Sequence, residues 1–214
     1  MKKSPTTEEL IERGFASKNG KLEILFIYPA TTVASRVAPK LRKNGKLQEE
    51  DIGEVGGKTI PLGIASLAAY LREKGIGVGV LDCDALDLEI EKVNEIIEKK
   101  DPAIIGFSVT TYGLSTALEL VKGVRKKFPK KLIVCGGAHA RDAEEKTSEI
   151  GFFDIFDIVT YGTDGEPIIH DVIQKYSKKN FDRNSFLQDF ALLENIKGII
   201  FRKKILLLEP LLEN

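Results

Sequence analysis

Four groups of hydroxyl-bearing, aromatic and glycine residues recur where apolar runs end, and they are the residues best suited to ligand chemistry. They are Tyr28-Pro29, Ser108-Val109-Thr110-Thr111, Gly136-Gly137 and Tyr161-Gly162-Thr163. In an open α/β sheet, ligands bind in the crevice outside the carboxyl ends of the strands. Hydroxyl groups there can hydrogen-bond a polar or phosphate-bearing ligand, and glycines let it approach the backbone closely. The pattern therefore predicts a binding crevice.

The elements that must position these groups alternate between strand and helix. Five apolar runs predict strands, at residues 22–28, 78–81, 103–109, 132–135 and 155–161. Between them apolar residues recur with helical spacing, as at Ile64, Leu67, Ala68 and Leu71. This alternation predicts an α/β fold of three layers around a parallel five-stranded sheet with right-handed crossovers. We expect a flavodoxin-like or Rossmann-like sheet with strand order 2-1-3-4-5, counted along the chain.

The rest of the chain is expected to flank one binding domain. We assign residues 21–180 to that domain, 1–20 to an N-terminal extension and 181–214 to a C-terminal extension. Residues 197–208 have the pattern of one or two short strands around Lys203-Lys204, which predicts a hairpin at the edge of the sheet.

Composition excludes several classes of partner. The 32 basic and 32 acidic residues balance, so no charge excess indicates binding to nucleic acid. No apolar run reaches the roughly 18 residues of a membrane span, and residues 1–20 lack the apolar core of a signal peptide. Cys83 and Cys135 lie inside apolar runs, which favours buried reduced thiols and a cytoplasmic protein.

Motifs that would indicate catalysis fail on spacing. The segment from Gly53 to Thr59 resembles a phosphate loop but has three residues between Gly53 and Gly57, where the loop needs four. The two histidines, His139 and His170, are far apart and have no cysteine partner, so we expect no protein-built metal site. We assign no catalytic residue. His139 is a candidate ligand contact because it follows Gly136-Gly137.

Eight segments follow one another in the order of a known protein family. They are Ile24–Pro29, Pro61–Arg72, Val80–Cys83, Ile105–Thr111, Val134–Ala140, Asp157–Gly162, Gly165-Glu166 and Ile196–Arg202. Together they resemble the N-terminal domain of cobalamin-dependent radical S-adenosylmethionine enzymes, and the similarity covers roughly residues 22–208. Two positions depart from the family pattern. Gly162-Thr163-Asp164-Gly165-Glu166 stands where Gly-Glu-Gly-Glu is usual, and Ala138 stands where proline is common.

The resemblance implies that cobalamin is held at the carboxyl edge of the sheet with its nucleotide tail inserted into the domain. It implies hydrogen bonds from Ser108, Thr110 and Thr111 to the tail, and space for the flat benzimidazole at Gly136 and Gly137. We therefore expect a bulky residue at position 137 to abolish binding without unfolding the protein. The full set of expected cofactor-binding residues is Tyr28, Pro29, Thr31, Thr32, Ser108, Thr110, Thr111, Gly136, Gly137, His139, Tyr161, Gly162 and Thr163.

Two absences qualify what the resemblance implies. Residues 30–58 contain no histidine, so we expect base-off cobalamin without a histidine ligand from this loop, unlike the methionine-synthase type of carrier. Residues 31–36 or a water would then face the lower side of cobalt. The chain also lacks the three-cysteine motif that holds a four-iron cluster. We expect a free-standing or truncated cobalamin-binding module, with a radical S-adenosylmethionine protein or domain as its partner.

Two other interpretations remain open at this point. The same crevice could bind a flavin or a nucleotide, with Thr31, Thr32 and Ser35 lining a phosphate site. Alternatively, the domain could bind no cofactor and serve as an interaction scaffold that docks through residues 206–212. The absorbance spectrum after reconstitution separates the three interpretations.

Overall fold

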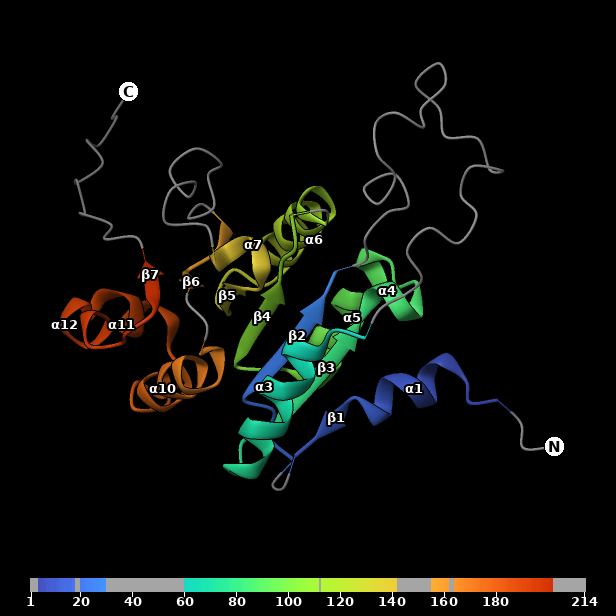
Figure 1. The fold of residues 1–214 in the computed structure, drawn as a ribbon, viewed down its shortest axis with the longest axis horizontal. Coiled ribbons are helices and arrows are strands. Elements are labelled where there is room, and N and C mark those ends of the chain that lie inside the picture. Colours follow the sequence, from blue (N-terminus) through green and yellow to red (C-terminus); the bar gives the residue numbers. More distant parts are fainter. Residues whose placement is uncertain are drawn as a thin grey trace, which may run out of the picture.

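A seven-stranded sheet forms the centre of the protein (Figure 1). The computed structural model describes residues 4–17, 20–29, 60–111, 113–141, 155–161 and 164–201. The strand order is β1-β3-β2-β4-β5-β6-β7. The parallel strands are β2 (Ile24–Tyr28), β3 (Val78–Asp82), β4 (Ile104–Ser108), β5 (Leu132–Gly136) and β6 (Ile158–Thr160). These five have the order 2-1-3-4-5 among themselves, which confirms the expected topology.

Helices cover both faces of the sheet (Figure 1). They are α1 (Thr7–Arg13), α3 (Leu62–Glu73), α4 (Cys83–Leu86), α5 (Ile90–Lys100), α6 (Leu114–Lys127), α7 (Ala138–Arg141), α10 (Gly165–Ser177), α11 (Arg183–Gln188) and α12 (Phe190–Glu194). Strand β2 shows how the layers arise, because Ile24 and Phe26 pack toward α3 and α10 while Leu25 and Ile27 pack toward α5 and α6. A parallel strand that is buried on both faces needs such an uninterrupted apolar run.

The sheet has two antiparallel edge strands in addition to the five parallel ones. At one edge β1 (Phe15–Ala16) pairs with β3, and the Nη2 atom of Arg72 donates to the carbonyl oxygens of Gly14 at 2.8 Å and Val78 at 3.2 Å. At the other edge β7 (Ile199–Phe201) pairs with β6. Strand β7 corresponds to the first half of the expected hairpin, and residues 202–214 lie outside the described part of the chain.

A buried carboxylate anchors the amino-terminal end of β6. Asp157 pairs with Arg125 of α6 at 2.7 Å and with Arg183 of α11 at 2.5 Å, and it accepts a hydrogen bond from the Ile133 N–H at 2.9 Å. Its side chain is 5% exposed. Because a buried charge needs partners, this network fixes α6 and α11 against the sheet at the end opposite the predicted crevice.

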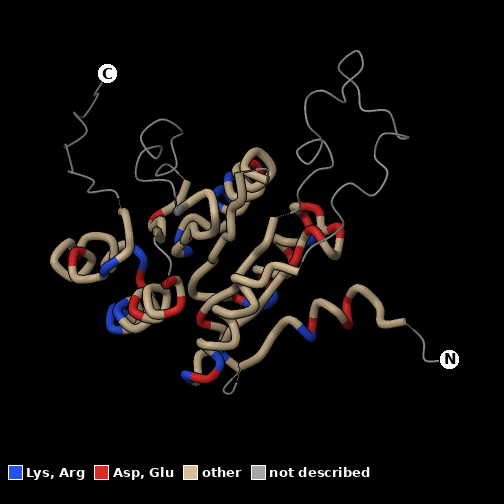
Figure 2. The backbone as a smooth tube through the Cα atoms, in the orientation of Figure 1, with Lys and Arg blue, Asp and Glu red and all other residues tan. Residues whose placement is uncertain are grey.

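Charges of both signs are interspersed along the helices (Figure 2). Within the described ranges, no helix combines the length and the apolar character needed to cross a membrane.

Candidate functional site

A cavity of about 400 Å³ lies between the carboxyl half of the sheet and the helices α3 and α10. Its volume falls within the roughly 300–1,000 Å³ typical of ligand pockets. The lining residues are Phe26, Gly63, Ile64, Leu67, Gly106, Phe107, Ser108, Val134, Gly136, Gly137, Ala138, Thr160, Tyr161, Gly165, Glu166, Ile168 and Ile169. The cavity therefore lies at the carboxyl edge of the sheet, where the sequence predicts the crevice.

Strand register explains the floor of this cavity. Phe26 of β2 lies opposite Gly106 of β4, which in turn lies opposite Val134 of β5. Two residues further along, Ser108 lies opposite Gly136. Because residues two apart point to the same face of a strand, both rows face α3 and α10. The first row makes an apolar floor, and the second row begins a more polar mouth.

Polar groups gather at the mouth. The Thr160 hydroxyl donates to the Cys135 carbonyl oxygen at 3.2 Å, and Tyr161 follows it along the chain. The Ser66 hydroxyl of α3 donates to Oε1 of Glu166 of α10 at 2.6 Å, which joins the two helices. Glu166 is the charged residue among the described lining residues. A ligand bound here would have its apolar part at the floor and its polar part at the mouth.

Two glycines of the lining have different physical roles. A Cβ at Gly63 of α3 would meet nothing within 4 Å, so the missing side chain leaves space open to the cavity. Gly137 has φ +101°, and a Cβ there would lie 2.7 Å from the Val109 carbonyl oxygen and 2.8 Å from the Val109 nitrogen. Glycine at position 137 is thus required by the close approach to β4. A bulky residue there would displace this backbone, contrary to the expectation of an unperturbed fold.

The structure brings some of the expected site residues together in the cavity and places others near it. Ser108, Gly136, Gly137 and Tyr161 line the cavity. Five others lie close to the same edge but outside the lining: Tyr28, Pro29, Thr110, Thr111 and His139. Four more lie outside the described residues: Thr31, Thr32, Gly162 and Thr163.

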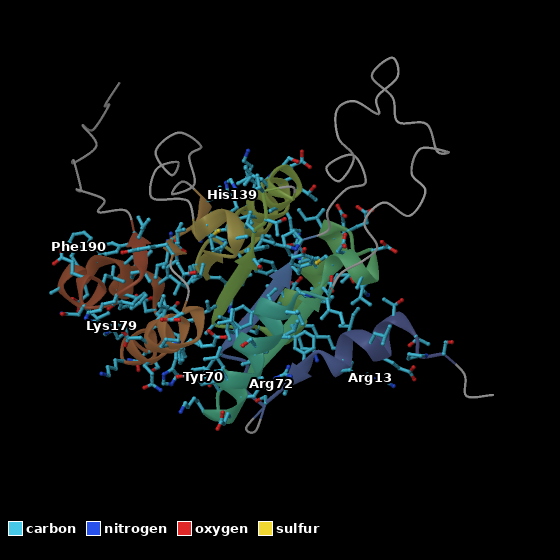
Figure 3. The ribbon with its side chains drawn as sticks, in the orientation of Figure 1. Arg13, Tyr70, Arg72, His139, Lys179 and Phe190 are labelled. Atoms are coloured by element: carbon cyan, nitrogen blue, oxygen red, sulfur yellow. The ribbon has the colours of Figure 1, made fainter. Side chains whose placement is uncertain are left out.

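The residues around His139 form a local hydrogen-bond network. His139 lies on α7 at the carboxyl edge, whereas Arg72 lies at the far end of α3 (Figure 3). His139 is 7% exposed, and its Nδ1 is 3.2 Å from the Thr111 hydroxyl. The Thr110 hydroxyl accepts from the Gly113 N–H at 3.2 Å. These contacts stabilise the turns behind the mouth, and contact of these residues with a cofactor stays a prediction.

Sequence reasoning missed the helical side of the cavity. Leu67, Glu166 and Ile168 come from α3 and α10 and line the cavity, as does Gly63 of α3. On the strand side, Gly106 of β4 was missed as well. One available signal was Gly106, because a glycine inside a strand often marks a close approach of ligand or backbone. Gly63, in the first turn of α3, was a second signal, because a glycine there leaves the space beside the helix open.

The two thiols are unsuited to reactivity or metal binding. Burial is the main cause that raises the pKa of the Cys83 thiol to about 12, with smaller contributions from the carboxylates of Asp82 and Asp84. Burial also raises the pKa of Cys135. Among the residues that the structure describes, no group of three or more His, Cys, Asp and Glu side chains could hold a metal ion.

Comparison with known proteins identifies a family whose match spans most of the residues that line the cavity. The B12 binding domain family matches residues 51–169, more than half of the chain, and this range contains every lining residue except Phe26. A segment of 93 residues is 34% identical to an uncharacterized methyltransferase of Pyrococcus horikoshii. That segment is 44% of this chain and 20% of the relative, so the match covers about a fifth of the relative's length. The chain belongs to the family of B12-binding domains, whose cofactor is cobalamin.

Proposed function

We propose that this chain, through the domain at residues 21–180, holds base-off cobalamin for a methyltransferase system, with the nucleotide tail of the cofactor in the cavity between the sheet, α3 and α10. The cavity carries this proposal, because its polarity matches the tail. The tail ends in a flat apolar benzimidazole, which is joined to the corrin through a polar ribose and phosphate. The apolar row from Phe26 to Val134 suits the base, and the mouth around Ser108 and Tyr161 suits the polar groups.

Both the walls and the floor of the cavity support insertion of a flat group. Gly106 and Gly136 contribute no side chain on the sheet, and Gly63 leaves open space on α3. The Ser108 hydroxyl at the end of β4 can donate to an acceptor at the mouth. Glu166 can accept a hydrogen bond from a ribose hydroxyl but disfavours a phosphate beside it. We therefore place the phosphate toward Ser108 and Gly137.

The positions of the histidines support base-off binding without a histidine ligand from the first loop. Residues 30–58 contain none. His139 lies outside the cavity lining, with its Nδ1 at hydrogen-bonding distance from Thr111. His170 lies in the middle of α10, with its ring in edge contact with Tyr70 of α3.

Catalysis would need a second protein or domain. This chain has two cysteines, both buried, so it cannot supply the three thiolates of a four-iron cluster. We propose that a radical S-adenosylmethionine domain or subunit provides that cluster and the substrate site. When bound, cobalamin would supply the methyl-carrying chemistry at its cobalt. The residues of this chain would bind the tail, orient the corrin and exclude water from the base.

Reconstitution tests this function directly. Purified protein is incubated with hydroxocobalamin, freed of unbound cofactor by gel filtration and examined by absorbance. We expect close to one cobalamin per chain with a base-off spectrum. A base-on spectrum would refute the proposed insertion of the tail, and failure to retain cobalamin would refute the function itself. Parallel incubation with flavin tests the alternative ligand, for which we expect no retention.

A further inference from the structure

We propose that the outer face of α3 docks against a second copy of this chain, with the two α3 helices antiparallel across a two-fold axis near Ala65. The outer face of α3 comprises the exposed residues from the start of the helix to its third turn, which are Ile60, Leu62, Gly63, Ala65, Ser66 and Ala69. The dimer forms without cofactor, so its test is independent of the proposed function.

The outer face of α3 exposes large apolar side chains where a solvated helix normally exposes charges. Ile60 is 76% exposed and Leu62 is 74% exposed. No residue from 60 to 71 is charged, although 30% of the residues in the chain are. On α5, by contrast, every exposed position is charged, namely Glu91, Glu95, Glu98 and Lys99. An uncharged face that carries exposed apolar side chains indicates a surface for another protein.

The uncharged surface continues onto α10, which packs beside α3 (Figure 1). The exposed positions of α10 are Pro167, Gln174 and Ser177, and none of them is charged. The half-buried Asp171 pairs with Lys175 on the same helix. An interface between proteins needs roughly 1,000 Å² of buried surface in total, so α10 adds area that the face of α3 alone lacks. The two helices together support a weak dimer.

The distribution of side chains along α3 favours a second copy in an antiparallel arrangement. In a two-fold interface, residue i contacts j and j contacts i, so a charged residue at the axis would face its own copy. A face without charges avoids this repulsion. With the axis near Ala65, the large side chain of Leu62 lies over the small Ala69 of the other copy. Parallel packing would instead bring Glu73 and Lys74, at the charged end of the helix, against themselves.

The antiparallel arrangement keeps the two cavities apart. Helix α3 begins at the cavity, which Gly63 lines, and runs away from it to Glu73. In an antiparallel pair the cavity of the second copy therefore lies at the other end of the helices. Each chain then presents its own cavity separately.

Sedimentation equilibrium of the cofactor-free full chain tests the association. We expect a reversible equilibrium between monomer and dimer with a Kd of about 1–100 μM, as for a small interface. Leu62→Arg should weaken the dimer about a hundredfold, because burial of a leucine is worth at least roughly tenfold and occurs twice in the dimer. The inference is overturned if the unmodified chain stays monomeric well above this range of concentration, or if Leu62→Arg dimerises as tightly as the unmodified chain.

Leu10→Arg is the matched control. Leu10 is 39% exposed on α1, where it lies among the exposed charged residues Glu9, Glu12 and Arg13. Because a single exposed apolar residue needs no partner to cover it, we expect this variant to dimerise like the unmodified chain. An equal loss in the two variants would overturn the inference, since it would show a general effect of added charge. Thermal unfolding verifies that both variants are folded.

Engineered cysteines test the antiparallel arrangement on a non-reducing gel after mild oxidation. The native Cys83 and Cys135 are buried and do not compete. Ala65→Cys should form a disulfide with its own copy. Leu62→Cys and Ala69→Cys should form one when the two variants are mixed and not when each is alone, because a disulfide needs Cα atoms within about 7 Å. Self-crosslinking of Leu62→Cys alone, or the absence of a mixed disulfide, would overturn the arrangement.

Discussion

Filling the mouth of the cavity from α3 should raise stability and lower cofactor affinity at the same time. Gly63 is exposed, lines the cavity and belongs to the first turn of α3. A Cβ there would meet no atom within 4 Å, so Gly63→Ala creates no clash within the protein, and the side chain of Gly63→Leu starts from open space. The two variants therefore test cofactor affinity separately from the stability of the fold.

The two effects have different magnitudes. Glycine is less favourable than alanine inside a helix by roughly 0.5–1 kcal/mol. For a chain of this length, up to about 1 kcal/mol corresponds to a rise in Tm of up to about 4 °C. The leucine side chain at position 63 would project into the 400 Å³ cavity and take space from the tail. We expect hydroxocobalamin affinity to fall at least about tenfold, or about 1.4 kcal/mol.

The assay pairs thermal unfolding of the cofactor-free protein with equilibrium dialysis against hydroxocobalamin. Ala65→Leu is the control, because Ala65 is exposed on the same helix but does not line the cavity. Ala65→Leu should leave the affinity unchanged. The reasoning is refuted if Gly63→Leu binds hydroxocobalamin as tightly as the unmodified chain, or if it binds worse only because it has lost stability.

Two further predictions concern parts of the molecule remote from the cavity. Asp157→Asn should lower the free energy of unfolding by about 3 kcal/mol, because it removes the charge that pairs with Arg125 and Arg183. Denaturant titration measures this free energy. A loss below about 1 kcal/mol would show that the network does not anchor the helices. Cys83 and Cys135 should not react with a thiol reagent at pH 8 in the folded protein. Burial raises the pKa of both thiols and keeps them protonated and inaccessible. A fast reaction before denaturant is added would contradict this prediction.

The parallel strands were predictable because each is buried on both faces and so consists of a continuous apolar run. The expected strand at residues 103–109 is β4 (Ile104–Ser108), and that at 155–161 is the shorter β6 (Ile158–Thr160). Strand β1 was not predicted, because Phe15-Ala16 is too short to show a period and forms a strand by pairing with β3. Helices α11 and α12 were missed because they are short and their apolar residues are interspersed with polar ones.

The candidate site was predictable on the strand side and hidden on the helix side. Ser108, Gly136 and Tyr161 follow apolar runs, and parallel topology brings the ends of such runs to one edge. Leu67 and Glu166 are 99 positions apart, and only the packing of α3 beside α10 makes them line one cavity. Gly137 shows a further limit of sequence-based prediction. A glycine at the end of a strand suggests space for a ligand, whereas the structure shows that Gly137, with φ of +101°, is needed because its backbone lies close to Val109.

The sequence by itself determined the α/β class, the strand order and the edge at which the cavity lies, because buried parallel strands and their terminal residues leave a local pattern. Tertiary structure alone decided the depth and polarity of the cavity. Register sets Phe26 over Gly106, and the packing of the helices sets Ser66 against Glu166. These contacts join residues distant in the chain, and no local period encodes them.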